Sequence, residues 1–201
     1  DVNHIDARLP IQYVIRPQTH KYRDYRGYAG KIEGGAFKKG DRIKVLPSGF
    51  KSTIKTIEIN GKNIEAAYSP MSVSVTLKDD LDISRGDMIV KENNVPVISQ
   101  DLDLMICWMD SANLKSRKKV IIKHTTNECM GMITDILYKL DINTLHSIKD
   151  SENFKLNDIG RIKIRSSKPL FYDSYKKNRH TGSIILIDPN TNATIAAGMI
   201  I

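Results

Sequence analysis

Apolar and polar residues alternate along this chain in short stretches, and no long stretch has the spacing of an amphipathic helix. The clearest stretch is Met71–Leu77, in which four apolar residues are interleaved with three that carry hydroxyl groups. Successive side chains of a β-strand point to opposite faces of the sheet, so this segment has one apolar face and one polar face. The pattern predicts a strand that packs on a core with one face and meets water with the other.

Further strands and turns are predicted throughout the first half of the chain. Asn60-Gly61 follows the strand predicted at 53–59 and gives the strongest hairpin prediction, because a tight turn of this type needs two residues that tolerate a positive φ. The other joints contain glycine, proline or aspartate, as turns do. The strands expected here are Ile11–Ile15, Gly30–Glu33, Arg42–Leu46, Thr53–Ile59 and Asp87–Lys91.

The polar segment Glu92–Pro96 separates two sets of strands, and we place a domain boundary there. Many short strands at regular spacing are typical of sandwiches and closed barrels. We therefore expect an all-β fold with two antiparallel β-barrels, one in residues 1–96 and one in residues 97–201. Helix is limited to single turns at Asn143–Ile148 and Asp150–Phe154. The strands expected in the second half begin with the face shared by Leu102, Leu104, Ile106 and Trp108 and continue at Val120–His124, Met130–Tyr138, Ile159–Ile164, Ser183–Asp188 and Ala193–Ile200.

The net charge of +8 at first suggests an anionic partner such as nucleic acid. The charge is spread evenly, however, with 16 lysines and arginines against 12 acidic residues up to Pro96 and 15 against 11 after it. The densest basic runs, Arg117–Lys119 and Lys176–Arg179, are short. A solvated surface is the favoured interpretation, and nucleic-acid binding stays open as the alternative.

Targeting and redox features point to an ordinary intracellular protein. No window approaches the roughly 18 uncharged apolar residues of a membrane-spanning helix. The first residues lack the basic and apolar regions of a signal peptide. We therefore expect a cytoplasmic protein that does not enter a membrane. In that compartment Cys107 and Cys129 are expected to be unpaired, buried thiols.

Motifs that carry chemistry are absent from the sequence. No phosphate-binding loop, dinucleotide-binding glycine motif or zinc-ligand spacing occurs. The five histidines are scattered singly, without the spacing that places two rings on one face. Asp79, Asp80 and Asp82 could hold a cation or act as acid and base, but a solvated turn is the favoured interpretation. We expect no catalytic residue, no cofactor site and no metal site in this chain.

Two sets of motifs nevertheless resemble a known family. The run Arg26–Asp41 resembles the strand pair G-x-V-x-x-G-x-x-x-x-G-D in the second domain of translational GTPases such as elongation factor Tu. More specifically, Asp24–Gly30, Val45–Gly49 and Asp82–Asp87 resemble the large, GTPase-bearing subunit of bacterial sulfate adenylyltransferase. Motifs of the second half agree with that family's third domain; they are Trp108-Met109, Leu140–Leu145, Asn178–Ser183 and Asn192–Ile200.

The resemblance implies a domain type for each half of the chain and a function for the parent protein. Residues 1–96 would form a barrel like domain 2 of translation factors, and residues 97–201 one like the C-terminal domain of elongation factors. The family's GTPase domain would lie before Asp1, and some members continue into a fused adenylylsulfate kinase domain. The parent enzyme makes adenylylsulfate and pyrophosphate from ATP and sulfate on a separate small catalytic subunit, driven by GTP hydrolysis, and is expected to use GTP, ATP and Mg.

The barrels would then couple the state of the GTPase domain to the small catalytic subunit without performing chemistry themselves. An RNA-binding module of a translation-type GTPase is the alternative, because elongation factor barrels bind tRNA. The basic and aromatic residues that would serve it are Tyr22, Arg23, Tyr25, Arg26 and Tyr28, but on a strand they divide between two faces.

Arg26 and Tyr28 are the candidates for contact with the small subunit, because arginine and aromatic residues are enriched at interfaces. The competing interpretation is that Tyr28 packs inside the first barrel and Arg26 covers its end.

Overall fold

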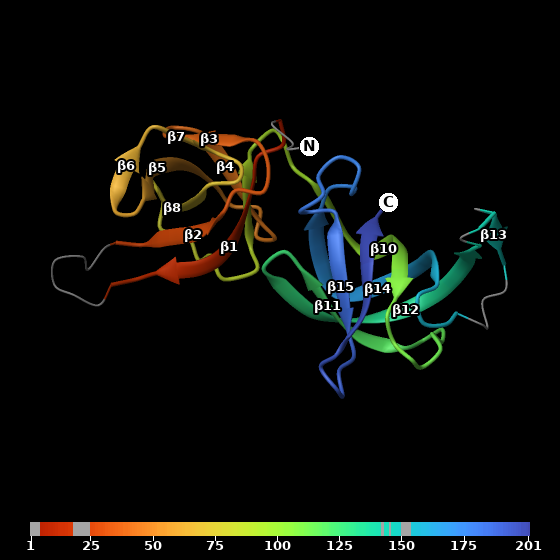
Figure 1. The fold of residues 1–201 in the computed structure, drawn as a ribbon. Coiled ribbons are helices and arrows are strands. Elements are labelled where there is room, and N and C mark those ends of the chain that lie inside the picture. The colour runs from red at the N-terminus through yellow and green to blue at the C-terminus, as the bar shows by residue number, and fades with distance from the viewer. Residues whose placement is uncertain (1–4, 18–24, 142, 145, 150–153) are drawn as a thin grey trace. The chain divides into compact units, whose positions relative to one another are not determined.

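The computed structural model describes residues 5–17, 25–141, 143–144, 146–149 and 154–201 (Figure 1). All the regular elements of these residues are β-strands. No helix among them is long and apolar enough to span a membrane. Contacts divide the chain into two compact units, Asp1–Pro96 and Val97–Ile201, and each is described by itself.

The first unit is a closed antiparallel barrel of six strands. They are β1 (Arg8–Ile15), β2 (Gly27–Lys31), β4 (Arg42–Leu46), β5 (Lys51–Ile59), β8 (Ser72–Leu77) and β9 (Met88–Lys91). Their order is β4-β9-β1-β2-β8-β5, and pairing of β4 with β5 completes the ring. Outside the ring, β6 (Lys62–Ile64) extends β5, and β3 (Ala36–Lys38) pairs with β7 (Ala66–Tyr68). Closure leaves no free edge within the ring.

The alternation of apolar and polar residues along the strands explains how the first barrel fills its core. On β8, Val73, Val75 and Leu77 are buried while the residues between them are not. The turn from β5 to β6 has Asn60 at φ 50° and Gly61 at φ 75°, as the hairpin prediction requires. The first strand of the chain is less regular, because it pairs with β9 at its start and with β2 at its end.

A buried arginine joins the two ends of the first unit. The side chain of Arg8 is fully buried, and its Nη1 donates to the carbonyl oxygen of Asn94 at 2.7 Å and to Asn94 Oδ1 at 2.6 Å. Asp6 lies 3.5 Å from its Nη2, and Asn94 in turn donates to Asp6 at 2.9 Å. A buried charge needs such partners, since removing it from water is costly. The segment before β1 is therefore tied to the segment after β9.

The second unit is also a closed antiparallel barrel of six strands. They are β10 (Val97–Trp108), β11 (Lys119–His124), β12 (Asn127–Leu140), β14 (Ile159–Tyr172), β15 (Ser183–Ile187) and β16 (Thr194–Ile200). Their order is β11-β15-β16-β10-β14-β12, and pairing of β11 with β12 completes the ring. The core contains Trp108 and Phe154, both fully buried, among aliphatic side chains from every strand. The expectation of an all-β fold with two antiparallel barrels is confirmed.

One expectation about local structure is wrong. Ser147–Ile148, which lies in the predicted helical turn 143–148, forms β13 and pairs with Lys139 and Leu140 at the end of β12. The long strand β12 continues past the barrel and offers backbone partners there, and these outweigh a weak helical preference. Residues 142, 145 and 150–153, which include most of the other predicted turn, lie outside the described part of the chain.

Candidate functional site

Tyr28 lies on β2 with its ring in the core of the first barrel. The residue is 1% exposed, and its hydroxyl donates to the backbone carbonyl of Leu81 at 2.6 Å. Burial raises the pKa of this phenol. Its hydrogen bond satisfies the one polar atom of an otherwise apolar position. The structure thus places Tyr28 inside the first barrel rather than on its surface.

Arg26 lies next to Tyr28, just before β2, and binds the loop 79–82. Its Nη1 is 2.5 Å from Asp80 Oδ1 and donates to the Leu81 carbonyl at 2.6 Å, while Nη2 is 3.6 Å from Asp82 Oδ1. The arginine side chain is 17% exposed, whereas Asp80 and Asp82 are 84% and 92% exposed. Ion pairs to such exposed partners contribute at most about 1 kcal/mol each. Their main effect is on geometry, because Arg26 and Tyr28 share one carbonyl acceptor and fix the loop against β2.

The carboxylates of this loop have partners within the first barrel. Asp79 accepts a hydrogen bond from Ser52 Oγ at 2.7 Å, and its own N–H donates back to that hydroxyl at 3.3 Å. Asp80 and Asp82 lie beside Arg26. The loop is therefore an anchored turn, with no arrangement of its carboxylates around a shared ligand. Among the residues the structure describes, no group of three acidic, histidine or cysteine side chains could hold a metal ion.

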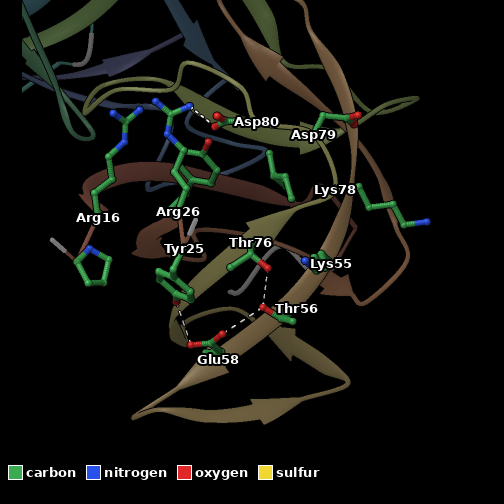
Figure 2. Close-up of a pocket in the computed structure, with 13 residues that line it drawn as sticks. Arg16, Tyr25, Arg26, Lys55, Thr56, Glu58, Thr76, Lys78, Asp79 and Asp80 are labelled. Carbon is green, nitrogen blue, oxygen red and sulfur yellow. Dashed lines mark hydrogen bonds and ion pairs between the residues drawn. The ribbon is translucent and has the colours of Figure 1, made fainter. Parts of the chain in front are cut away.

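A hollow of about 590 Å³ opens beside Arg26 on the first barrel (Figure 2). Polar side chains that line it are hydrogen-bonded to one another. Tyr25 donates to Glu58 Oε2 at 3.0 Å, and Thr56 donates to Glu58 Oε1 at 3.2 Å. The hydroxyls of Thr56 and Thr76 lie 2.7 Å apart. The hollow is lined by Arg16, Pro17, Tyr25, Arg26, Tyr28, Lys55, Thr56, Glu58, Thr76, Leu77, Lys78, Asp79 and Asp80.

The electrostatics of the hollow are mixed. Cationic groups come from Arg16, Arg26, Lys55 and Lys78, and acidic groups come from Glu58, Asp79 and Asp80. Figure 2 shows Arg16 and Arg26 on one side of the group and Lys78 on the other, so the cations are divided between two sides of the hollow. This arrangement suits a polar protein surface better than a single phosphate, which requires several donors aimed at one position.

The basic and aromatic residues considered for RNA binding are not an open stacking surface. Tyr28 is buried, Tyr25 is bonded to Glu58, and Arg26 faces two carboxylates. Tyr22 and Arg23 lie outside the described residues. Recognition of single-stranded RNA needs exposed aromatic faces beside free cations. Among the described members only Tyr25 has a partly exposed ring, and the cation near it, Arg26, is paired with carboxylates.

A buried polar cluster in the second unit escaped the sequence analysis. His124 is 2% exposed, and its Nε2 donates to the Thr181 carbonyl at 2.7 Å. The Thr181 hydroxyl donates to Asp173 at 2.9 Å, and the side chain of Asn178 accepts from the Thr181 N–H at 3.3 Å. Burial lowers the pKa of His124, while the Thr181 carbonyl and Asp173 oppose that shift. In the sequence, Asn178–Ser183 indicated only the family resemblance, and the histidine that contacts this segment is more than fifty residues away in sequence.

The two cysteines are free thiols. Cys129 is buried, and burial raises the pKa of its thiol, whereas Cys107 is half-buried on β10. A thiol with a raised pKa is a poor nucleophile at neutral pH. Cys129 therefore belongs to the packing of the second barrel.

Comparison with known proteins assigns the second unit to a family. The model of the family described as GTP-eEF1A C-terminal domain-like matches residues 101–201. In fold, 98% of the chain superimposes on 47% of a Sup35 chain crystallised with GDP, with a TM-score of 0.85 and 17% identical residues. The Sup35 structure covers both units, so the likeness of fold extends to the first barrel.

Relatives in sequence cover the whole chain. It is 46% identical to the bifunctional enzyme CysN/CysC of Mycobacterium tuberculosis and spans 33% of that protein. It is 42% identical to sulfate adenylyltransferase subunit 1 of Bacteroides thetaiotaomicron and spans 42% of that protein. The resemblance drawn from the motifs is thereby confirmed. The chain belongs to the GTP-eEF1A C-terminal domain-like family, and proteins named sulfate adenylyltransferase subunit 1 and CysN/CysC are its relatives along its full length.

Proposed function

We propose that this chain is the two-barrel part of a sulfate adenylyltransferase large subunit and that it couples a GTPase domain to the small catalytic subunit. Residues 1–96 then serve as a barrel like domain 2 of translation factors, and residues 97–201 as one like the elongation factor C-terminal domain. The observation that carries the proposal is identity over the whole chain, 42% to sulfate adenylyltransferase subunit 1 and 46% to the bifunctional enzyme CysN/CysC.

In this role the chain performs no chemistry. The parent enzyme joins ATP and sulfate to give adenylylsulfate and pyrophosphate, with GTP, ATP and Mg bound elsewhere. Two closed barrels suit the transmission of a nucleotide-dependent movement, because packed closed sheets move as rigid bodies and shift partner contacts as units. Arg26 remains a candidate for contact with the small subunit, with Tyr28 as its support from within the barrel.

Binding of the small subunit tests the proposal. The small catalytic subunit from the same genome is titrated onto the immobilised 201-residue chain and onto the full-length large subunit, at low and at physiological salt. We expect saturable binding to both, weaker at high salt because both barrels carry excess positive charge. The two barrels of a translation elongation factor are the control and should not bind. Absence of binding to the full-length large subunit would overturn the proposal.

A parallel titration with tRNA distinguishes the RNA-binding alternative. We expect only weak association that disappears at physiological salt, as for any basic protein. If tRNA binds at physiological salt and the small subunit does not, the chain is an RNA-binding module instead.

A further inference from the structure

The outward face of the second barrel is sharply divided into a charged half and an apolar half. On the charged half, Arg165 of β14 lies opposite Asp101 of β10, and Arg161 reaches diagonally from its place opposite Met105 to Asp103. Arg161 bonds both oxygens of Asp103 at 2.7 and 2.6 Å, and Arg165 bonds Asp101 at 3.0 Å. This half has the polar surface expected of a sheet that faces water.

The apolar half, which we call the methionine face, runs across five strands from β10 to β12. Cross-strand pairs join its members: Met105 with Met199, Ile185 with Ala197, Ile121 with Ile187, and Ile121 with Met130. The methionine face consists of Met105, Cys107, Ile121, Met130, Met132, Ile185, Ile187, Ala197 and Met199.

These side chains are not needed for the core of the second barrel. The opposite face of the same strands is fully buried, with Ile122 and Leu186 at 0% exposure and Ile184 at 2%. Met130, Met132, Ile185 and Met199 nevertheless remain 39–43% exposed. Strands that are apolar on both faces are typical of sheets covered on both sides. Contiguous exposed apolar surface of this kind marks an interaction site.

The boundary of the methionine face lies within a single strand. The outward residues of β10 change from Asp101 and Asp103 to Met105 and Cys107 with no break in the strand. On the neighbouring β14 the outward residue opposite Met105 is Arg161, so the border of the methionine face also runs between β10 and β14. The chain therefore carries a delimited apolar surface.

Barrel closure and the surrounding charges describe the partner. Each strand under the methionine face is paired on both sides, so a partner cannot add a strand and must bind through side chains. Lys119 and Lys123 flank the face on β11, are exposed, and have no ion-pair partner among the described residues, with Glu128 opposite Lys123. The excess of charge at this border is positive. A complementary partner is apolar at its centre and acidic along one edge.

We infer that the methionine face is the surface on which the small catalytic subunit docks. The inference rests on the proposed function and locates the contact on the second barrel. The thioether side chains of Met105, Met130, Met132 and Met199 adapt to different partner shapes, which suits a contact that must survive movement of the large subunit. Lys119 and Lys123 then steer an acidic edge of the small subunit toward β11.

Charge introduced into the face tests the inference. Ile185→Glu combined with Met199→Glu should weaken binding of the small subunit to the full-length large subunit roughly thirtyfold or more, as loss of a buried interface anchor does. The matched control, Ser147→Glu with Ile148→Glu, adds the same charges to exposed positions of β13 and should bind like the parent. Lys119→Glu with Lys123→Glu should slow association and reduce its dependence on salt.

Methionine oxidation provides a test that needs no variant. Dilute peroxide is applied to the large subunit with and without the small subunit, and oxidised methionines are quantified by mass spectrometry. We expect protection of Met130, Met132 and Met199 in the complex and none of Met71, which lies partly exposed in the first barrel. Equal oxidation in both samples, together with parent-like binding by a folded Ile185→Glu/Met199→Glu variant, overturns the inference but leaves the proposed function standing.

Two other outcomes have distinct meanings. If the parent subunit does not bind the small subunit at all, the proposed function fails, and this inference fails with it. If the parent dimerises in sedimentation and the Ile185→Glu/Met199→Glu variant is monomeric while it still binds the small subunit, a second copy of the chain covers the face, which overturns the inference.

Discussion

A single backbone carbonyl, that of Leu81, organises the region around Arg26. It accepts from both the Arg26 guanidinium and the Tyr28 phenol, at 2.6 Å in each case. One of these donors is buried and the other is partly exposed, so core and surface are coupled at this point. Substitution of either residue removes one hydrogen bond to Leu81 and is therefore expected to loosen the loop 79–82.

Separate substitutions distinguish the surface role of Arg26 from the structural role of Tyr28. Tyr28→Ala should cost about 3–5 kcal/mol of folding free energy, as for other buried aromatic residues, so the informative changes are Tyr28→Phe and Arg26→Ala. If Arg26 contacts the small subunit, Arg26→Ala should lower the affinity for that subunit and make the affinity less dependent on salt. Lys62 is an exposed cation on β6, and the control variant Lys62→Ala should change neither property. Unchanged affinity and salt dependence in a folded Arg26→Ala/Tyr28→Phe variant would exclude this face.

His124 makes the stability of the second barrel depend on pH. Because burial lowers its pKa below the ordinary value of 6.5, the unfolded chain binds a proton at a higher pH than the native chain does. Stability from this group is thus fully present above about pH 6.5 and is lost as the pH falls through the native pKa. His124→Gln, which keeps a donor for the Thr181 carbonyl, should flatten the fall of urea midpoints between about pH 7.5 and pH 5. His146→Gln, at an exposed position, is the control, and equal slopes in both variants would contradict the assignment.

Strands of the second barrel approach one another closely where glycine allows it. A Cβ built at Gly131 on β12 would lie 2.3 Å from Cδ1 of Ile122 on the neighbouring β11. Gly160 on β14 is equally close to the carbonyl of Tyr138. A larger residue at either position would clash with its neighbours, so these two glycines permit the close packing seen there.

Gly131→Ala is expected to destabilise the second barrel by about 1–3 kcal/mol, because the added methyl group overpacks the core. Ile122→Val removes Cδ1, the nearer of the two Ile122 atoms that the added methyl group would meet, and by itself costs about 0.5–1.5 kcal/mol. The double variant should be more stable than the sum of the two single effects predicts, as denaturant titrations can measure. Additive losses would show that Ile122 is not the obstructing side chain.

Regular strands could be predicted from the sequence, and irregular ones could not. β4 (Arg42–Leu46) has the bounds that alternation gives, because no bulge interrupts it. β14 extends to Tyr172, eight residues past the predicted end, because the register shifts in its pairing with β10 reset the phase of the alternation. β2 begins at Gly27, since Gly27 and Gly30 allow close strand packing where the sequence resembles a turn.

In the candidate site too, some features could be predicted from the sequence and others could not. Burial of Tyr28 follows from its place in the alternation, one of the two interpretations that the sequence allowed. The contact of Arg26 with Asp80 joins residues 54 positions apart and depends on how the barrel closes. The methionine face was equally hidden, because it combines outward positions from five strands whose order in the barrel the sequence does not state.

At the scale of the whole chain, we expect no nucleotide binding. The sequence contains no phosphate-binding loop, and no other motif supplies the successive backbone N–H groups that cradle phosphates. Calorimetric titration of the 201-residue chain with GTP and magnesium should give no heat above dilution. A GTPase-bearing relative measured in parallel is the positive control, and a micromolar dissociation constant for this chain would reveal a nucleotide site that the motifs do not show.

The contact of Arg8 with Asn94 has a mechanical consequence for the first barrel. The start of β1 and the end of β9 lie at the same end of an antiparallel pair, so tension applied through the two connections of this unit would peel those strands apart one hydrogen bond at a time. The Arg8 guanidinium closes that end, and its hydrogen bonds to Asn94 must break before the strands begin to separate. These buried hydrogen bonds of Arg8 thus work as a latch, and load entering at one connection can leave by the other without opening the sheet.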